Sequence, residues 1–368
     1  MSQADITEPL PDVDGDHPPR FTRALIGHER AQSDFLSALQ GTRLPHAWLL
    51  SGPEGIGKAS FAYMVARAVL SAPSPQAIQE LSPVRDTPET QLIENSVHPD
   101  LYVLNRRYNP KTEKFRGDIS VDDTREMKKA FGLSASRGGW RIAIIDSIDE
   151  MNKSSVNALL KLIEEPPEKC LFLIVCHNPG RVLDTIRSRC RQLSFGALDE
   201  SHLQQIIAGR LEAVDENEAA AAAFLAEGSA GRALMLAEMG GFDLYRDMVG
   251  VLEGLPQLDM ESLHGLAGRF GARSEPQSFR LFCYLLSGWL HRVVRVASTG
   301  QGFQPVFQGE AELVERLVAG DLPLEPMLSL WEKVQHQVRQ IEGLNLDKKQ
   351  AIMEWIGRLA EIIRMKSA

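Results

Sequence analysis

Residues 52–58 are the part of the chain best suited to bind phosphate. Gly52, Gly55 and Gly57 have the spacing of a phosphate-binding loop, and Lys58 follows them directly. In such a loop the backbone N–H groups point at phosphate oxygens, the N-terminus of the next helix adds a favourable dipole, and the lysine adds a positive charge. The spacing therefore predicts a nucleotide-binding loop rather than an ordinary glycine-rich turn.

Two positions near this loop depart from what ATP hydrolysis requires. The residue after the lysine normally offers a hydroxyl to Mg²⁺, but Ala59 has none, and Ser60 lies about 100° further around the helix. Asp146 ends a buried apolar run and is suited to hold the water shell of Mg²⁺. Ser147 follows it where an acid usually orients the attacking water, and a serine without a partner is no base near neutral pH. These residues predict a relict site without hydrolysis, and they leave open whether ATP or ADP still binds.

The segments around these residues alternate between apolar runs and amphipathic stretches. We expect strands over residues 48–50, 101–104, 141–145 and 171–175. We expect helices over residues 58–70, from Asp122 or Asp123 to about 133, and over 154–164. Residues 71–100 are rich in Pro, Ser and Glu and predict a connection with little regular structure. This alternation predicts an α/β fold with a parallel, doubly wound sheet.

The pattern changes along the chain and indicates several domains. Residues 1–20 are rich in Asp and Pro and predict a disordered tail. The α/β P-loop domain is expected over residues 21–198, after which the strand signals disappear. A small helical domain over 199–240 and a helical C-terminal domain over 241–368 complete the predicted organisation.

The composition indicates an ordinary cytoplasmic globular protein. Hydrophobic residues make up 43% of the chain and charged residues 24%, and we find no signal peptide and no apolar run of membrane-spanning length. The net charge of −9 argues against a surface that grips DNA as a whole, so DNA contact would need a local patch or partner subunits. One basic stretch exists, and we interpret it as a solvated hairpin rather than a DNA site: Arg106, Arg107, Lys111, Lys114 and Arg116.

Three further segments carry a specific resemblance to a known family. Residues 43–47, 157–167 and 185–190, together with the phosphate loop, resemble the clamp-loader branch of the AAA+ ATPases over about residues 25–237. With the departures at Ala59 and Ser147, the chain is most similar to the delta-prime subunits of bacterial DNA polymerase III clamp loaders. The resemblance implies an AAA+ P-loop domain, a helical lid domain and an all-α C-terminal collar domain for oligomerisation.

The resemblance also implies a function and partners. It implies a non-hydrolysing stator that helps to load the sliding clamp onto primed DNA during replication, as part of the DNA polymerase III holoenzyme. Its expected partners are gamma- or tau-type motor subunits and delta-type subunits, with the sliding clamp and primer-template DNA reached through the complex and no membrane involved.

Three residues receive roles from this resemblance, and each keeps an alternative. Arg189 would be an arginine finger acting in trans on a nucleotide bound by a neighbouring subunit, or else part of a surface salt bridge. The sensor 1 residue would lie within residues 176–178, where we favour Asn178, which would otherwise be a loop-capping residue. Arg232 would be the sensor 2 arginine, or else a surface arginine at a helix N-terminus. The predicted nucleotide-site residues are thus Gly52, Gly55, Gly57, Lys58, Ala59, Asp146, Ser147, Asn178 and Arg232, with Arg189 as the predicted catalytic residue.

No metal site is expected. Many members of the family bind zinc through four cysteines after the P-loop helix, but residues 71–100 contain no cysteine. The chain has four cysteines without a CxxC pair, which we interpret as free thiols in a reducing compartment: Cys170, Cys176, Cys190 and Cys283. No zinc and no required cofactor are therefore predicted.

Two other functions remain as alternatives. An active AAA+ ATPase, the motor subunit of the same complex, would be expected to have Thr at position 59 and an acid at position 147. A different P-loop enzyme such as a small-molecule kinase would not need residues 188–190 or the long helical C-terminal part. Measurable ATP turnover by the isolated chain would favour an enzyme over a stator.

Overall fold

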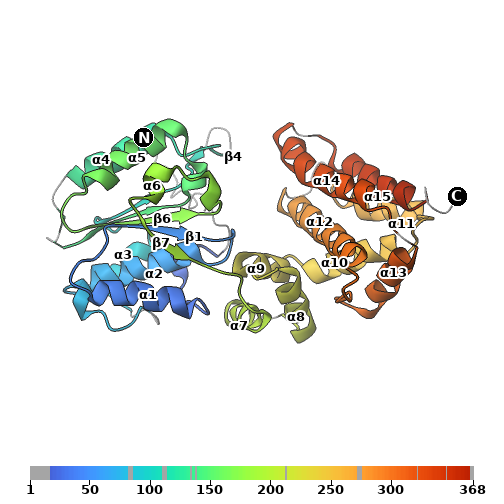
Figure 1. The fold of residues 1–368 in the computed structure, drawn as a ribbon, viewed down its shortest axis with the longest axis horizontal. Coiled ribbons are helices and arrows are strands. Elements are labelled where there is room, and N and C mark those ends of the chain that lie inside the picture. The colour runs from blue at the N-terminus through green and yellow to red at the C-terminus, as the bar shows by residue number, and fades with distance from the viewer. Residues whose placement is uncertain are drawn as a thin grey trace, which may run out of the picture. The chain divides into compact units, whose positions relative to one another are not determined.

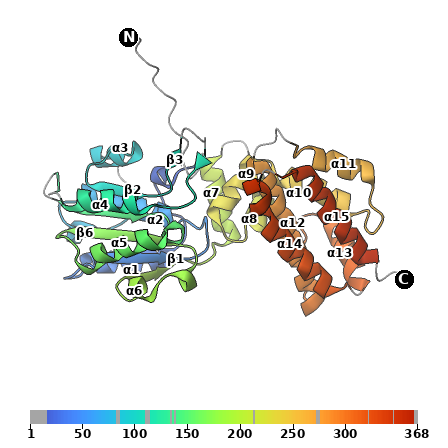
Figure 2. The same cartoon turned by 90° about the horizontal axis from the view of Figure 1, so that it is seen from above.

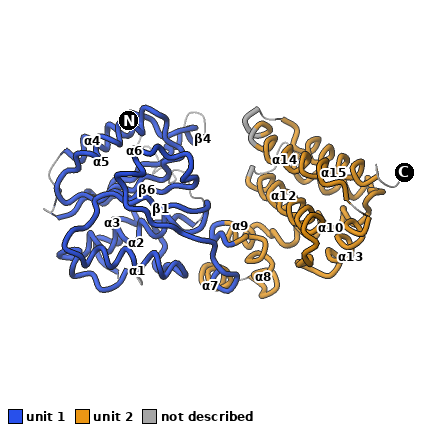
Figure 3. Tube along the Cα trace, viewed as in Figure 1, with its two compact units in different colours: residues 1–202, 228–231 blue, residues 203–227, 232–368 orange. Residues whose placement is uncertain are grey.

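The computed structural model describes residues 17–81, 86–109, 114–132, 135–136, 139–211, 214–271, 276–320, 322–344 and 346–364. The chain divides into two compact units: one comprises Met1–His202 with Gly228–Gly231, and the other comprises Leu203–Glu227 with Arg232–Ala368 (Figure 3). Residues 1–16 of the predicted tail lie outside the described residues. The predicted domain boundaries at residues 198 and 240 stay predictions.

A five-stranded parallel sheet forms the centre of the first unit (Figure 1). Its strand order is β2-β5-β6-β1-β7. The strands are β1 (Ala47–Ser51), β2 (Leu101–Leu104), β5 (Arg141–Ile145), β6 (Cys170–Cys176) and β7 (Arg191–Ser194). The parallel sheet confirms the predicted α/β fold. We did not predict β7, because only Leu193 of its four residues is buried and the strand has no apolar run.

Helices cover both faces of this sheet (Figure 1). They are α1 (Glu29–Gln40), α2 (Lys58–Ser71), α3 (Pro88–Glu94), α4 (Val121–Gly132), α5 (Lys153–Glu164) and α6 (Asp184–Arg187). Successive residues of β6 face opposite sides, so that Leu173 packs in the core beneath α1 and α2, whereas Phe172 packs in the core beneath α4 and α5. The doubly wound arrangement places the loops after β1, β5 and β6 at one edge of the sheet, because parallel strands end on the same side.

The prediction of little regular structure over residues 71–100 is wrong for part of that segment. Pro88–Glu94 forms the helix α3, whose N-cap is Thr87: its side chain accepts a hydrogen bond from the backbone N–H of Thr90. Proline is well tolerated at the first position of a helix, and Ile93 buries the inner face of this short one. Pro88, one of the prolines that argued against a helix, is therefore the first residue of this helix.

The basic stretch forms a hairpin whose arginines bind carboxylates. β3 (Tyr108–Asn109) pairs antiparallel with β4 (Lys114–Phe115), which confirms the predicted hairpin. Lys111 lies outside the described residues. The ion pairs join Arg106 to Glu150 at 2.9 Å, Arg107 to Asp123 at 2.9 Å and to Glu126 at 2.6 Å, and Arg116 to Asp123 at 3.8 Å.

The second unit is helical over its described residues. It contains α8 (Glu216–Leu225), α10 (Gly241–Leu252), α11 (Met260–Gly268), α12 (Pro276–Thr299), α13 (Gln308–Ala319), α14 (Leu324–Leu344), α15 (Lys348–Arg364) and most of α7 (Glu200–Arg210) and α9 (Ala230–Glu238). Figure 2 shows α12, α14 and α15 packed side by side. In the described part of the chain, no helix combines the length and apolar character needed to cross a bilayer.

Candidate nucleotide site

The phosphate loop connects β1 to α2. β1 ends at Ser51 and α2 begins at Lys58, so residues 52–57 form the turn between them, as the sequence predicts. Gly57 is the N-cap of α2 with φ 108°, and Gly55 has φ 74°, a left-handed conformation that favours glycine. A Cβ atom at Gly55 would also lie 2.5 Å from the Oγ of Ser229, so this position needs glycine for space as well as for conformation.

Protein donors hold the outer side of this loop. Three consecutive carbonyl oxygens of the loop accept hydrogen bonds. The Glu54 carbonyl accepts from the Oγ of Ser229 at 3.1 Å, and the Gly55 carbonyl accepts from the N–H of Gly231 at 2.8 Å. The Ile56 carbonyl accepts from the Nε2 of His28 at 2.9 Å. Burial lowers the pKa of His28, which favours the neutral imidazole with its one N–H. Sequence reasoning missed these three donors, and the run of small residues at 228–231 was the only local signal for two of them.

The side chain of Lys58 binds the loop itself. Its Nζ donates hydrogen bonds to the carbonyl oxygens of Gly52 at 2.7 Å and of Pro53 at 2.5 Å, and the residue is only 2% exposed. Burial lowers the pKa of Lys58 to about 8, and the nearby Asp146 partly opposes this effect. The structure thus brings the two predicted residues Lys58 and Asp146 together. A phosphate group would have to replace the loop carbonyls as the partner of the ammonium group.

At the two positions that depart from a hydrolytic site, one side chain is apolar and the other has no hydrogen-bond partner among the described residues. Ala59 packs against the core beneath α1 and α2. Ser147 is 1% exposed, and its Oγ has no hydrogen-bond partner among the described residues. The hydroxyl of Ser60 lies 3.1 Å from that of Thr22. Ser60 therefore does not replace the hydroxyl that is missing at position 59. Burial and the neighbouring Glu150 raise the pKa of Asp146 to about 6, and Lys58 acts in the opposite direction.

Asn178 lies just after β6, beside the phosphate loop. The last residue of β6, Cys176, pairs in register with Ser51 at the end of β1. Asn178 is the N-cap residue of the following turn Pro179–Arg181, and its backbone carbonyl rather than its side chain accepts a hydrogen bond from that turn. The position fits a residue that contacts nucleotide, and the sensor 1 role stays a prediction.

Arg189 lies at the surface of the first unit, shortly after α6. Its Nη2 forms an ion pair with the Oε1 of Glu164 at 3.0 Å, and its Nη1 donates to the carbonyl oxygen of Thr185 at 2.9 Å. The Arg189 side chain is 39% exposed. The surface salt bridge that was the alternative for Arg189 therefore exists. The role as an arginine finger stays a prediction, since exposed ion pairs of this kind contribute only about 0–1 kcal/mol and can be exchanged for a stronger anion.

Arg232 belongs to the second unit, where its guanidinium lies 5.0 Å from the centre of the Tyr284 ring. Such a cation–π contact with a residue of α12 is a structural role that the sequence did not predict. The sensor 2 role of Arg232 stays a prediction.

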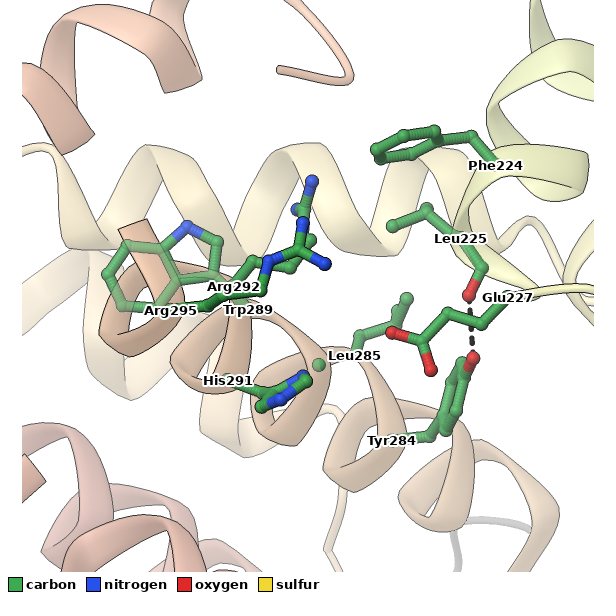
Figure 4. Close-up of a pocket in the computed structure, with 10 residues that line it drawn as sticks. Phe224, Leu225, Glu227, Tyr284, Leu285, Trp289, His291, Arg292 and Arg295 are labelled. Atoms are coloured by element: carbon green, nitrogen blue, oxygen red, sulfur yellow. Dashed lines mark hydrogen bonds between the residues drawn. The ribbon is translucent and has the colours of Figure 1, made fainter. Parts of the chain in front are cut away.

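The second unit also contains a cavity of about 160 Å³ (Figure 4). The end of α8 and one face of α12 line it, and Figure 4 shows the Tyr284 hydroxyl, which donates to the Leu225 carbonyl at 2.6 Å. Arg292 reaches its wall but is already paired with Glu310 at 2.6 Å. Because this guanidinium is neutralised within the unit, we assign no ligand to the cavity.

The cysteines are free, as predicted, and all four are buried. Burial raises the pKa of Cys176 to about 11 and that of Cys190 to about 12, so neither is a thiolate near neutral pH. Across the described ranges, no three His, Cys, Asp or Glu side chains gather where they could hold a metal ion. The absence of zinc stays a prediction.

The parallel sheet and the glycine-rich loop between β1 and α2 give this unit the architecture of a P-loop domain. Residues 27–199, somewhat less than half of the chain, match the family described as "DNA polymerase III, delta subunit", so this part of the chain is similar to that family. The match includes the phosphate loop, Asp146 and Arg189, but not Arg232.

Curated relatives extend this finding. The DNA polymerase III subunit tau/gamma of Haemophilus influenzae is 30% identical over 190 residues, which are 52% of this chain and 26% of that protein. The DNA polymerase III subunit delta' of Pseudomonas aeruginosa is 34% identical over 147 residues, 40% of this chain and 42% of that protein. The matches thus span less than half the length of either relative. A solved gamma subunit-related protein of Thermotoga maritima aligns over 90% of this chain and 99% of its own, with 15% identity and a TM-score of 0.42.

Proposed function

We propose that the chain is a clamp-loader subunit of DNA polymerase III of the delta-prime type, which acts in the cytoplasm and does not hydrolyse ATP. The observation that carries the proposal is a built phosphate loop that lacks the two groups needed for hydrolysis. Ala59 offers no oxygen to a metal ion, and the Ser147 hydroxyl is buried without a partner among the described residues. Without a metal ligand and a group that orients water, the loop can hold a phosphate but cannot promote its transfer.

The proposed role of the loop is therefore structural. Its carbonyl groups accept hydrogen bonds from Ser229, Gly231 and Lys58, and Lys58 is buried against it, so contacts within the protein support the shape of the loop. A bound ATP or ADP would be a stable ligand held by the loop N–H groups and Lys58, and no cofactor is required for the proposed function.

The proposed chemical contribution is that of Arg189. A guanidinium placed at the γ-phosphate of a nucleotide in a neighbouring subunit stabilises negative charge in the transition state. Arg189 meets the first requirement, because it lies on the surface of the first unit and is 39% exposed. The proposed partners are gamma- or tau-type motor subunits and a delta-type subunit, with the sliding clamp and primer-template DNA bound by the assembled complex.

A second candidate function is an active motor subunit, which is supported by the similarity to a tau/gamma subunit at 30% identity. A measurement of ATP turnover separates the two candidates. The purified chain is assayed for phosphate release beside Lys58→Ala. We expect no turnover above that of the Lys58→Ala variant. Turnover that Lys58→Ala abolishes would show that the chain is itself a motor.

Reconstitution tests the proposed role of Arg189. The chain is combined with motor and delta-type subunits of the same organism, sliding clamp and primed DNA. Arg189→Ala should enter the complex normally and lower its DNA-stimulated ATP hydrolysis, since arginine fingers contribute about 10³-fold or more at their own site. Arg187→Ala is the matched control, because among the described residues Arg187 forms an ion pair only with the exposed Asp184, and it lies just two residues away. An unchanged rate for Arg189→Ala would refute the assignment.

A further inference from the structure

Two different elements hold the guanidinium of Arg189. Its Nη1 donates to the Thr185 carbonyl at 2.9 Å and lies 3.5 Å from the Ser188 Oγ, both within its own turn. Its Nη2 pairs with the Oε1 of Glu164, the last residue of α5, at 3.0 Å. These contacts fix both terminal nitrogens, so the side chain has one defined orientation. The Nε–H and one N–H of Nη2 have no partner among the described residues and remain for another anion.

The end of α5 is a firm support for this contact. Leu162 and Ile163 are buried in the core beneath α4 and α5, and the Nε2 of His46 donates to the Ile163 carbonyl at 2.9 Å. Pro166 follows and prevents the helix from continuing. The Glu164 carboxylate therefore projects from backbone that is anchored on both sides.

The position of this carboxylate is unusual for its charge. A negative side chain at the C-terminus of a helix is disfavoured by the helix dipole. The Arg189 guanidinium offsets that charge.

We propose that Glu164 is a positioning residue for Arg189: it holds the guanidinium in the orientation that meets the phosphate of a neighbouring subunit. This inference rests on the proposed function of Arg189. A free arginine side chain loses rotamer freedom when it engages a phosphate, at about 0.5–1.5 kcal/mol per immobilised side chain, and ordering it beforehand removes that cost. The pair is open to water, at 39% and 45% exposure, so it orders the arginine without binding it too tightly to exchange.

Glu165 provides a matched control next to Glu164 in the sequence. It is also a glutamate and also exposed, and its side chain makes no hydrogen bond or ion pair with any residue that the structure describes. If negative charge near α5 mattered in general, substitution of either glutamate would lower the rate of ATP hydrolysis. If Glu164 positions Arg189, only substitution of Glu164 lowers that rate.

The test uses the reconstituted complex and compares Glu164→Ala, Glu164→Gln, Glu165→Ala, Arg189→Ala and the double variant Glu164→Ala/Arg189→Ala. We expect Glu164→Ala to lower the kcat of DNA-stimulated hydrolysis about 3- to 10-fold at unchanged KM for ATP. Glu164→Gln should recover part of the rate, since its amide oxygen can still accept from Nη2. Glu165→Ala should match the unmodified chain. In the Arg189→Ala background, Glu164→Ala should have no further effect.

The outcomes separate this inference from the proposed function. If Arg189→Ala lowers the rate but Glu164→Ala does not, or acts equally in both backgrounds, Glu164 is not a positioning residue and the finger assignment survives. If Arg189→Ala leaves the rate unchanged, both proposals are wrong. Gel filtration confirms assembly of each variant, and if Glu164→Ala fails to assemble, the nearly isosteric Glu164→Gln and its double variant with Arg189→Ala decide the question.

Discussion

The Oδ1 of Asp149 accepts a hydrogen bond from the backbone N–H of Asn178 at 3.0 Å, and its Oδ2 accepts one from the N–H of His177 at 2.6 Å. One carboxylate thus joins the turn after β5 to the loop after β6. Asp149 is exposed, and its carboxylate caps the two backbone amides. This contact holds the backbone of His177 and Asn178, where the loop after β6 begins.

Removal of this cap should weaken the first unit. Asp149→Ala leaves the N–H groups of His177 and Asn178 without their acceptor, and we expect it to lower the free energy of unfolding by about 1–2 kcal/mol. Asp149→Asn keeps one acceptor oxygen and should recover part of the loss. Urea unfolding followed by circular dichroism measures the difference. An Asp149→Ala variant as stable as the unmodified chain would show that water replaces the carboxylate without penalty.

Lys58 should reduce the stability of the chain at neutral pH. Burial lowers its pKa to about 8, whereas the unfolded chain keeps the ordinary value of 10.5. Between these values the folded chain binds fewer protons than the unfolded chain, so its stability rises with pH over that window. Below pH 8 the buried charge exerts its full destabilising effect. Lys58→Met should therefore raise the free energy of unfolding at pH 7 by about 1–2 kcal/mol, after the loss of two hydrogen bonds is subtracted.

The pH dependence provides the check on this prediction. Urea unfolding of both proteins at pH 7 and pH 10 should show that the advantage of Lys58→Met shrinks at the higher pH, where most of the lysine is neutral in the folded chain. A variant less stable than the unmodified chain at pH 7 would mean that the bonds to Gly52 and Pro53 outweigh the burial of the charge.

Local patterns were enough to predict the phosphate loop and most of the sheet. Gly55 and Lys58 belong to a short motif between an apolar run and a helix, so their geometry follows from neighbours in sequence. The same reasoning failed for β7, a strand with one buried residue, and for α3, whose first residue is proline. In both segments tertiary contacts decide the structure, and the local sequence carries little hydrophobic pattern.

The donors that hold the phosphate loop could not be predicted from the sequence. His28 precedes Ile56 by 28 residues, and Ser229 follows Glu54 by 175 residues. A hydrogen bond to a backbone carbonyl requires no particular residue type at the accepting position, so no sequence pattern marks it. The sequence suggested a surface salt bridge for Arg189 but not its partner, because Glu164 is 25 residues away and several other acids are equally close in sequence.

The most consequential buried charge of the second unit is Glu310. It is fully buried, pairs with Arg292 at 2.6 Å, accepts from the N–H of Val306 at 2.7 Å and also accepts from the Tyr245 hydroxyl. Glu310→Ala would leave the Arg292 guanidinium buried without its counter-charge. We expect a loss of about 3–5 kcal/mol in the free energy of unfolding, the range found when one partner of a buried ion pair is removed.

The surface pair of Arg269 with Asp247 is the control for this prediction. Its side chains are 51% and 50% exposed, and their distance of 2.6 Å equals that of the buried pair. Asp247→Ala should change stability by less than about 1 kcal/mol. Arg292→Met combined with Glu310→Ala should lose less than the sum of the single variants, because no unpaired charge stays buried. Equal effects of Asp247→Ala and Glu310→Ala in urea unfolding would contradict the dependence on burial, since geometry alone cannot distinguish the two pairs.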